Sequence, residues 1–343
     1  MRHAKRTVPA QARPELSHAP GRDDAAGLLP SRSPGAPGVQ DAARRITEQA
    51  HAKINLTLEI LGKRPDGYHD LASVIQTVDL FDEVTVEAAD GIEVDCDGPA
   101  LAGEANLAYR AAEALRQRSG VKQGARISIA KRIPVAAGLG GGSADAAATL
   151  RALNRLWGTG LNTGQLAETG ATVGSDVPFL VRGGTALVQG RGERITPLPS
   201  ADLGWVILLC PDIHFEAKTK TVFSRVTPAN FTRGGLTFKL AARIRGGGDA
   251  PAELMFNAFT EVAPAVFPGW TGYRDTLASM GAREIILAGA GPAMFARAPR
   301  REIGTAWQLV LEKSHGWRAF LVRAWDPAAG SSNDSRGSGV EVK

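Results

Sequence analysis

The sequence predicts a globular fold that mixes strands with helices and divides into two domains. Its 343 residues exceed the roughly 250–300 residues at which a single hydrophobic core tends to stop growing. Hydrophobic residues make up 43% and charged residues 22% of the chain, a composition that allows a sizeable core. Between the two ends, segments with strand-like alternation are interspersed with segments of helical periodicity.

Four segments predict strands. Residues 53–61, 82–88 and 126–129 alternate apolar with polar side chains, and Gly, Pro or Asp bounds each of them. The uninterrupted apolar run Trp205–Cys210 has the length of a strand and is far too short to cross a membrane.

Two segments predict helices, and one predicts a loop. Residues 106–118 carry apolar side chains at helical spacing, namely Leu107, Ala111, Ala114 and Leu115. A second helical face is marked by spacings of four, three and four residues between Ala146, Leu150, Leu153 and Trp157. The stretch 243–251 contains three successive glycines and few apolar residues, which favours a flexible loop over a nucleotide site.

Both ends of the chain are predicted to be disordered tails, residues 1–48 and 326–343. The first is rich in Ala, Pro, Arg, Gly and Ser without an apolar period, so it buries too little surface to offset its chain entropy. A transit peptide is the alternative for this segment. The carboxylates of Glu15, Asp23, Asp24 and Asp41 argue against that alternative, because such peptides are poor in acidic residues.

The charge does not predict a nucleic-acid-binding surface. The formal net charge is +5, of which residues 1–48 carry +3, residues 326–343 carry −1 and the remaining 49–325 carry +3. This excess is too small for a groove that follows a phosphate backbone, and the basic residues are not interleaved with aromatic ones.

The cysteines and the apolar runs indicate a cytoplasmic protein without a membrane span. Cys96 and Cys210 are far apart and outside any CxxC spacing, so neither a disulfide framework nor a zinc site is predicted. A reducing compartment is the expected setting. No run approaches the roughly 18–20 apolar residues of a spanning helix.

The most informative segment is a glycine-rich loop that runs into the second predicted helix, PVAAGLGGGSADAA at residues 134–147. Four glycines in five positions would cost about 1 kcal/mol each within a helix. Without Cβ atoms, however, their amides can approach a bound anion closely, and the helix that follows offers free N–H groups and the positive end of its dipole. Ser143 would place a hydroxyl there for phosphate or a phosphate-bound metal.

Other interpretations of this loop are a flexible turn with Ser143 as the helix N-cap, a Walker A loop or a dinucleotide-binding loop. Walker A requires Lys and then Ser or Thr after the last glycine, whereas Gly142 is followed by Ser143 and Ala144. The dinucleotide spacing GxGxxG fails too, because Ser143 stands where the third glycine is needed. The turn interpretation stays open on the loop alone.

Residues 134–147 resemble the phosphate-loop motif of the GHMP kinases. Two further segments resemble one branch, the 4-diphosphocytidyl-2-C-methyl-D-erythritol kinases. AKINL at 52–56 with RPDGYH at 64–69 is similar to their amino-terminal signature, and GSDVPF at 174–179 is similar to their Gly-Ala-Asp-Val-Pro-Phe segment. The similarity covers about residues 50–323, is strongest up to 193 and is weak beyond 227.

The resemblance implies an α+β fold with two GHMP-kinase domains, ribosomal-protein-S5-like at residues 49–197 and ferredoxin-like at 198–325. It implies ATP and Mg²⁺ as cofactors and phosphorylation of the 2-hydroxyl of 4-diphosphocytidyl-2-C-methyl-D-erythritol in the non-mevalonate isoprenoid pathway. The expected partner is this small molecule, and both a monomer and a homodimer stay open.

The resemblance also assigns roles. Asp176 matches the base that takes the acceptor hydroxyl proton, and Lys53 matches the lysine beside it. If the resemblance is set aside, Asp176 is interpreted as an N-cap or turn residue and Lys53 as a solvated charge on a strand. Substrate-binding residues implied by the match are Asn55, Tyr68, His69, Thr219 and Phe223, with Tyr68 stacking on the cytosine and His69 bonding its edge. ATP-binding residues implied by the match are Asn106, Pro134, Gly138, Leu139, Gly140, Gly141, Gly142, Ser143 and Ala144. Lys131, just before the loop, is expected near the nucleotide, and Ser143 is a candidate Mg²⁺ contact.

The carboxyl-terminal half departs from the family pattern. LAGAGPAMFA at 287–296 has Ala288 and Ala290 where related kinases carry hydroxyl residues, so we expect close packing there without side-chain hydrogen bonds. FNAFT at 256–260 replaces the family's Asn-Asp-Leu-Glu segment. Two alternatives stay open. One is another GHMP kinase of homoserine or mevalonate type, against which the segment 66–69 argues. The other is a non-catalytic nucleotide- or RNA-binding member, which the altered third motif favours and the presence of Lys53 and Asp176 argues against.

Overall fold

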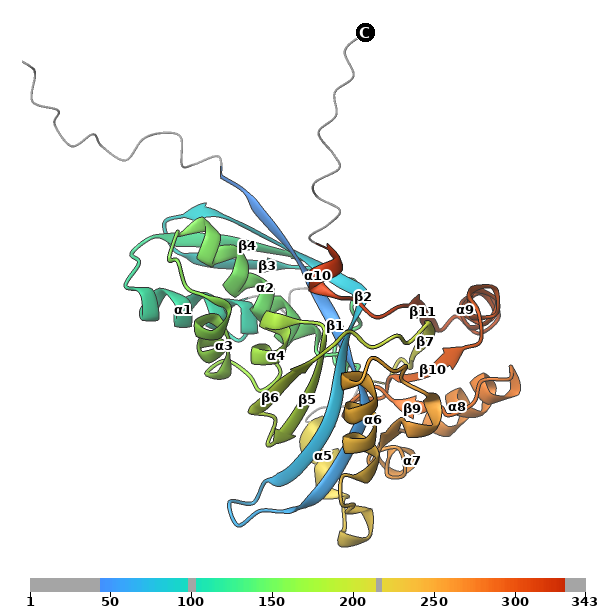
Figure 1. Cartoon of the computed structure of the whole chain (residues 1–343). Coiled ribbons are helices and arrows are strands. Elements are labelled where there is room, and N and C mark those ends of the chain that lie inside the picture. Colours follow the sequence, from blue (N-terminus) through green and yellow to red (C-terminus); the bar gives the residue numbers. More distant parts are fainter. Residues whose placement is uncertain (1–43, 98–102, 214–217, 331–343) are drawn as a thin grey trace, which may run out of the picture. The chain divides into compact units, whose positions relative to one another are not determined.

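The computed structural model describes residues 44–97, 103–213 and 218–330, which belong to one compact unit (Figure 1). The strands are β1 (Ile46–Lys63), β2 (His69–Ala89), β3 (Ile92–Cys96), β4 (Gly124–Ala130), β5 (Thr185–Gly190), β6 (Arg194–Leu198), β7 (Trp205–Cys210), β8 (Phe256–Asn257), β9 (Ile286–Leu287), β10 (Met294–Ala298) and β11 (Arg318–Val322). The helices are α1 (Leu107–Ser119), α2 (Gly141–Leu156), α3 (Thr163–Ala171), α4 (Val177–Arg182), α5 (Lys218–Ser224), α6 (Gly235–Arg245), α7 (Ala263–Val266), α8 (Trp270–Ser279), α9 (Arg301–His315) and α10 (Pro327–Gly330), with short 3₁₀ turns at Pro228–Asn230 and Ala252–Leu254.

A long antiparallel hairpin of β1 and β2 organises the first sheet. Its register runs from Ile46 opposite Val86 to Lys63 opposite His69. The sheet has seven strands in the order β3-β4-β2-β1-β8, and β5 and β6 continue from the same edge of β2 as β4. β1 extends beyond the predicted strand 53–61 at both ends. Both of its faces are buried from residue 50 to 60, so the alternation of apolar and polar residues that marks a strand in the sequence is weak there.

Helices α1 to α4 cover one face of this sheet (Figure 1). The predicted helix 106–118 is α1, and Asn106 is its N-cap, accepting a hydrogen bond from Ala108 N at 2.8 Å. α2 is the second predicted helix. Ten of its residues are buried, and its alanines let it pack closely on β1 and β2.

The second sheet has four strands in the order β11-β7-β10-β9 and separates two hydrophobic cores. In β7, Val206 and Leu208 belong to the core shared with α2, whereas Ile207 and Leu209 belong to the core of α7, α8 and α9. Burial on both faces explains why β7 is a continuous apolar run, and the predicted strand Trp205–Cys210 is confirmed.

The structure shifts several predicted boundaries. Residues 46–48, predicted as tail, are the start of β1, and α10 lies within the predicted tail 326–343. The predicted loop 243–251 begins later, because α6 continues to Arg245 and ends at Gly246. β8 pairs with β1, so a segment from the predicted second domain completes the first sheet. Among the residues that the structure describes, no helix has both the length and the apolar character that a membrane span needs.

Candidate active site

Lys53, Asn55 and Asp176 meet at one point beside the glycine loop. Lys53 is buried in β1, and its Nζ donates a hydrogen bond to Asn55 Oδ1 at 2.8 Å. The same Nζ lies 3.9 Å from Asp176 Oδ2. Asn55 donates in turn to Ser73 Oγ at 2.8 Å, which fixes the amide so that its oxygen faces the ammonium. Lys53 is therefore a buried cation held in a defined position. The alternative interpretation of Lys53 as a solvated charge on a strand is wrong.

Asp176 occupies the N-cap position of α4, but its carboxylate makes no capping bond. The side chain is 41% exposed, whereas that of Lys53 is 8% exposed. An N-cap carboxylate usually accepts a bond from the helix backbone. Here the carboxylate is directed to Lys53 and to solvent, so it is free to accept a proton from a bound molecule.

The glycine loop packs against a second glycine loop formed by residues 288–293. A Cβ on Gly138, whose φ is +93°, would lie 2.6 Å from Gly291 N. Ala293 N donates to Ala137 O at 3.0 Å, and Lys53 N donates to Leu139 O at 2.9 Å. The glycines thus serve the protein's own close packing as well as the backbone access expected from the sequence.

The N-terminal end of α2 suits an anion. Gly140 is the N-cap with φ +73° and offers no side-chain capping bond, and the first turn contains no acidic residue. Ser143 is the third residue of this helix and is not its N-cap, so the interpretation of Ser143 as a cap is wrong. The first N–H groups of this 16-residue helix have no partner within the helix, and its N-cap lies against Lys53, since a Cβ on Gly140 would be 3.0 Å from Lys53 Cγ. Ala136, at the tip of the loop, adopts φ +57°, a strained value for a residue with a Cβ.

Lys131, which the sequence places just before the loop, forms a buried ionic cluster under it. Its Nζ contacts Asp82 Oδ2 at 2.5 Å and Asp145 Oδ2 at 2.6 Å. Asp82 also accepts the backbone N–H groups of Arg132 and Ile133, and both carboxylates are almost fully buried. Burial raises the pKa of Asp145 to about 7. The positive charge of Lys131 lowers this pKa, and the negative charge of Asp82 raises it further. Lys131 therefore supports the base of the loop.

A buried asparagine that sequence analysis had noted only as part of an altered motif holds the second glycine loop. Asn257 Nδ2 donates to Leu287 O at 2.9 Å and to Gly289 O at 3.0 Å. Ala288 is fully buried and uses only backbone bonds, donating to Ala293 O and accepting from Asn55 N, both at 2.9 Å. The alanines thus pack closely, as expected. The signal in the sequence that could have predicted this role is Asn257 itself, a polar residue inside an apolar segment.

The predicted base-recognition residues gather at the tip of the β1–β2 hairpin. The His69 ring stacks on Phe223 with centroids 5.3 Å apart and an interplanar angle of 26°. Burial lowers the pKa of His69, and nearby Lys63 lowers it further, so the ring is neutral at pH 7 and offers one donor and one acceptor. Tyr68 is 55% exposed, and the Arg191 guanidinium lies over its ring at 3.8 Å from the centroid. Thr219 lies in α5, but its side chain is outside the described residues.

Asn106 caps α1 next to the glycine loop, since a Cβ on Gly142 would lie 3.6 Å from Leu107 Cδ1.

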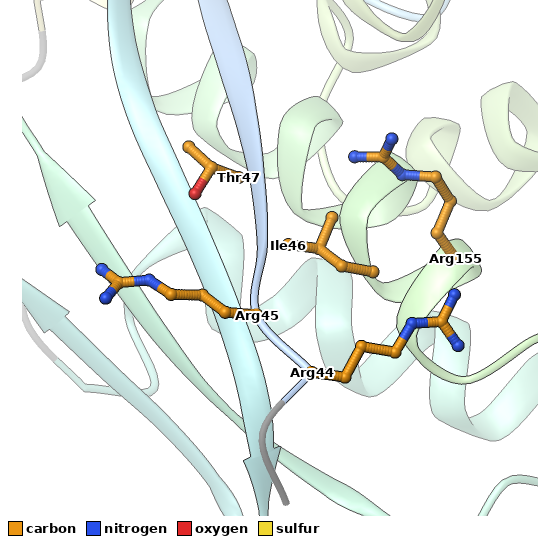
Figure 2. A pocket seen from close by; sticks show the side chains of 5 residues that line it. All are labelled: Arg44, Arg45, Ile46, Thr47 and Arg155. Carbon is orange, nitrogen blue, oxygen red and sulfur yellow. The ribbon is translucent and has the colours of Figure 1, made fainter. Parts of the chain in front are cut away.

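The structure also contains a cavity of about 320 Å³ lined by Arg44, Arg45, Ile46, Thr47 and Arg155 (Figure 2). None of these residues belongs to the predicted site. Arg155 pairs with Glu48 at 2.7 Å, and Arg45, which points away from Arg155 in Figure 2, pairs with Glu87 at 3.4 Å. The cavity is thus separate from the pair formed by Lys53 and Asp176.

Sequence comparison relates the whole folded part of the chain to known proteins. Residues 106–184 match the family described as the GHMP kinases N terminal domain. A 4-diphosphocytidyl-2-C-methyl-D-erythritol kinase from Dehalococcoides mccartyi is 40% identical over 286 residues, covering 82% of this chain and 99% of that protein. The corresponding kinase from Pelotomaculum thermopropionicum is 44% identical over 255 residues, covering 73% of this chain and 88% of that protein.

Comparison of structures gives the same relationship. A crystal structure of 4-(cytidine 5′-diphospho)-2C-methyl-D-erythritol kinase superimposes with a TM-score of 0.70 and 31% sequence identity, covering 82% of this chain and all of that chain (100%). A homoserine kinase from Cytophaga hutchinsonii has a TM-score of 0.63 at 18% identity, so it shares the fold alone.

Proposed function

Because the chain belongs to the 4-diphosphocytidyl-2-C-methyl-D-erythritol kinase family, we propose that it phosphorylates the 2-hydroxyl of that compound with ATP. The predicted fold class, the α+β fold of the GHMP kinases, is confirmed by the same relatives. The observation that carries the proposal is the free carboxylate of Asp176 facing the buried ammonium of Lys53 beside the glycine loop. A base and a cation beside a loop suited to phosphate are what phosphoryl transfer requires, and this supports the proposal.

Phosphoryl transfer needs the acceptor hydroxyl to be oriented and its proton to be removed. The 2-hydroxyl oxygen attacks the γ-phosphorus of ATP, the bond to the bridging oxygen breaks, and ADP leaves. Asp176 accepts the hydroxyl proton, and the Lys53 ammonium, 3.9 Å from the carboxylate, offsets negative charge nearby. Asn55 holds the ammonium in place through its side-chain oxygen. General-base catalysis of this kind contributes about 10²–10⁴-fold in rate.

The nucleotide phosphates fit the N-terminal end of α2. Its free N–H groups and the backbone of residues 138–142 would hold the phosphates, and Asn106 and Leu107 lie at the edge of the same loop. Mg²⁺ bound with ATP would offset phosphate charge, and Ser143 is the hydroxyl positioned at that end of the helix. At the other end of the site, His69 and Phe223 supply a neutral imidazole and an aromatic face for the cytosine, with Tyr68 as a second platform.

The test is release of ADP from Mg-ATP with purified 4-diphosphocytidyl-2-C-methyl-D-erythritol, with homoserine and mevalonate as control acceptors. Asp176→Asn should reduce turnover at least about 10²-fold. Asp90→Asn is the matched control, since Asp90 is exposed in the turn between β2 and β3, and it should retain wild-type turnover. Turnover with homoserine or mevalonate would assign a different GHMP kinase, and absence of turnover with any acceptor would favour the non-catalytic alternative.

A further inference from the structure

The turn between β5 and β6 connects the two ends of the proposed site. Arg191 lies in this turn, and its guanidinium covers the ring of Tyr68 at 3.8 Å from the centroid. The next residue, Gly192, lies against Ser175, since a Cβ on Gly192 would be 3.9 Å from Ser175 Cβ. Ser175 directly precedes Asp176. Arg191 therefore lies between the aromatic platform and the carboxylate that faces Lys53.

The position of this turn is fixed by the pairing of β5 with β2 and by the side chain of Glu193. β5 pairs with β2 from Leu71 opposite Gly190 to Gln76 opposite Thr185, so Gly190 is held next to the start of β2. Glu193 accepts a hydrogen bond from Arg191 N, which closes the turn. A Cβ on Gly190, whose φ is +73°, would overlap the Glu193 carboxylate. The backbone at Arg191 is thus well defined.

The Arg191 side chain keeps its hydrogen-bonding capacity. Among the residues that the structure describes, no carboxylate lies within salt-bridge distance of its guanidinium, although Asp66 is near enough for its pKa to be lowered in part by the Arg191 charge. A guanidinium that stacks on a ring uses its face and leaves its N–H groups directed outward in its own plane. Those donors match two phosphate oxygens at once.

We propose that Arg191 binds the diphosphate of the substrate. The inference rests on the proposed function, in which a cytosine lies at Tyr68 and a hydroxyl lies at Asp176. A molecule that joins a cytosine to a polyol through a diphosphate must place its phosphates between these two points, which is where Arg191 lies. The stack on Tyr68 holds the cation ready for the diphosphate.

The experiment separates the diphosphate from the base by measuring the binding of CDP and of cytidine to the full chain by calorimetry. Arg191→Ala should weaken CDP on the order of tenfold or more, the effect of losing a charge-assisted bond, and leave cytidine unchanged. In turnover, it should raise KM for the cytidyl substrate while leaving kcat and KM for ATP near their wild-type values. Arg191→Lys should restore part of the CDP affinity, because the charge returns without the planar fork.

Arg194→Ala is the matched control, because Arg194 is an exposed arginine on the same turn, at the start of β6, and it should change CDP affinity less than about twofold. If Arg191→Ala weakened the binding of CDP and of cytidine equally, Arg191 would only support Tyr68. If it weakened the binding of neither, Arg191 would be a surface residue without a role in binding. Either result would overturn the inference. Failure of the wild-type chain to bind CDP or to turn over would instead count against the proposed function.

Discussion

Gly138 and Gly291 lie backbone against backbone, so that a Cβ on Gly138 would be 2.6 Å from Gly291 N and 2.8 Å from Gly291 Cα. One glycine belongs to the proposed phosphate loop and the other to the loop after β9. Neither position has room for a side chain. The shape of the proposed nucleotide site therefore depends on a segment more than 150 residues away in the sequence.

Gly291→Ala should distort the phosphate loop. Its methyl group would overlap the Ala137 carbonyl and Gly138 N, and Gly291 does not need a positive φ, so the effect would come from packing alone. A displacement of about 1 Å at a catalytic site costs on the order of 100-fold in rate, so kcat/KM for ATP should fall by about that factor. Steady-state kinetics with varied ATP measures it.

Gly272→Ala is the control for this change. Gly272 is exposed within α8, and a Cβ there meets nothing within 4 Å. The substitution should stabilise the chain by about 0.5–1 kcal/mol through helix propensity, with unchanged kinetics. Wild-type kinetics in Gly291→Ala would show that the two loops adapt and that their contact does not set the geometry of the site.

The sequence predicts those features that depend on a local pattern of apolar residues or on a short motif. The strand Trp205–Cys210 and the helices beginning near residues 107 and 141 follow from apolar spacing, and Lys53 and Asp176 follow from their motifs. It could not give contacts between distant segments. The partners of Lys131, the anchoring role of Asn257 and the stack of Arg191 on Tyr68 depend on how the hairpin brings residues from other elements together, and no local periodicity encodes that.

Asn257→Ala should destabilise the chain strongly. Asn257 is 1% exposed, and its amide donates to Leu287 O and Gly289 O while its oxygen accepts from Phe259 N at 2.9 Å. Removing it leaves buried backbone groups without partners, which should cost about 2–4 kcal/mol in the free energy of unfolding. Urea titration measures this loss.

Asn230→Ala is the half-buried counterpart, with hydrogen bonds that are open to solvent. Asn230 also makes several hydrogen bonds, to Thr227 N at 2.9 Å and Glu261 at 3.2 Å among them, but water can replace those bonds. Its loss should cost no more than about 1 kcal/mol. Equal losses for the two variants would contradict the anchoring role of Asn257.

His51 should make the fold sensitive to mild acid. The ring is buried, its Nδ1 lies 3.0 Å from Val78 O, and it stacks on Trp325 with centroids 3.7 Å apart. Burial lowers its pKa to about 4 from 6.5, despite the Val78 hydrogen bond. Between these two pH values the unfolded chain binds a proton that the folded chain does not, so stability falls as pH drops from about 6.5 to 4, by up to about 3 kcal/mol.

His51→Asn should flatten this part of the stability curve, because asparagine keeps a donor toward Val78 O but does not titrate. His315→Asn, at an exposed position in the last turn of α9, should leave the wild-type slope unchanged. Urea unfolding at several pH values between 4 and 7 provides the slopes. An unchanged slope in His51→Asn would show that another group dominates acid sensitivity.

Asp145 should act in the opposite direction, since its charged form is disfavoured in the folded chain. Burial raises its pKa to about 7, and its Oδ1 has no hydrogen-bond partner among the described residues. Between pH 4 and 7 the folded chain holds a proton that the unfolded chain has lost, so this group's contribution to stability falls as pH rises and is lowest above about 7. Asp145→Asn should therefore stabilise the chain at pH 8 by about 1–3 kcal/mol and have little effect near pH 4.

Lys131→Met tests the same cluster from the other side. The Lys131 Nζ lies 2.5 Å from Asp82 Oδ2 and 2.6 Å from Asp145 Oδ2, and without it two buried carboxylates would face an apolar side chain. Breaking a buried ion pair by removing one partner costs about 3–5 kcal/mol, and the loss should be largest at pH 8, where both carboxylates would have to be charged. Asp95→Asn, at an exposed position on β3, controls for the loss of one carboxylate. If Asp145→Asn destabilised the chain at pH 8 as much as Lys131→Met, the Asp145 charge would be required by the fold, and the cluster would be a balanced ion network instead of a lysine shared by two competing carboxylates.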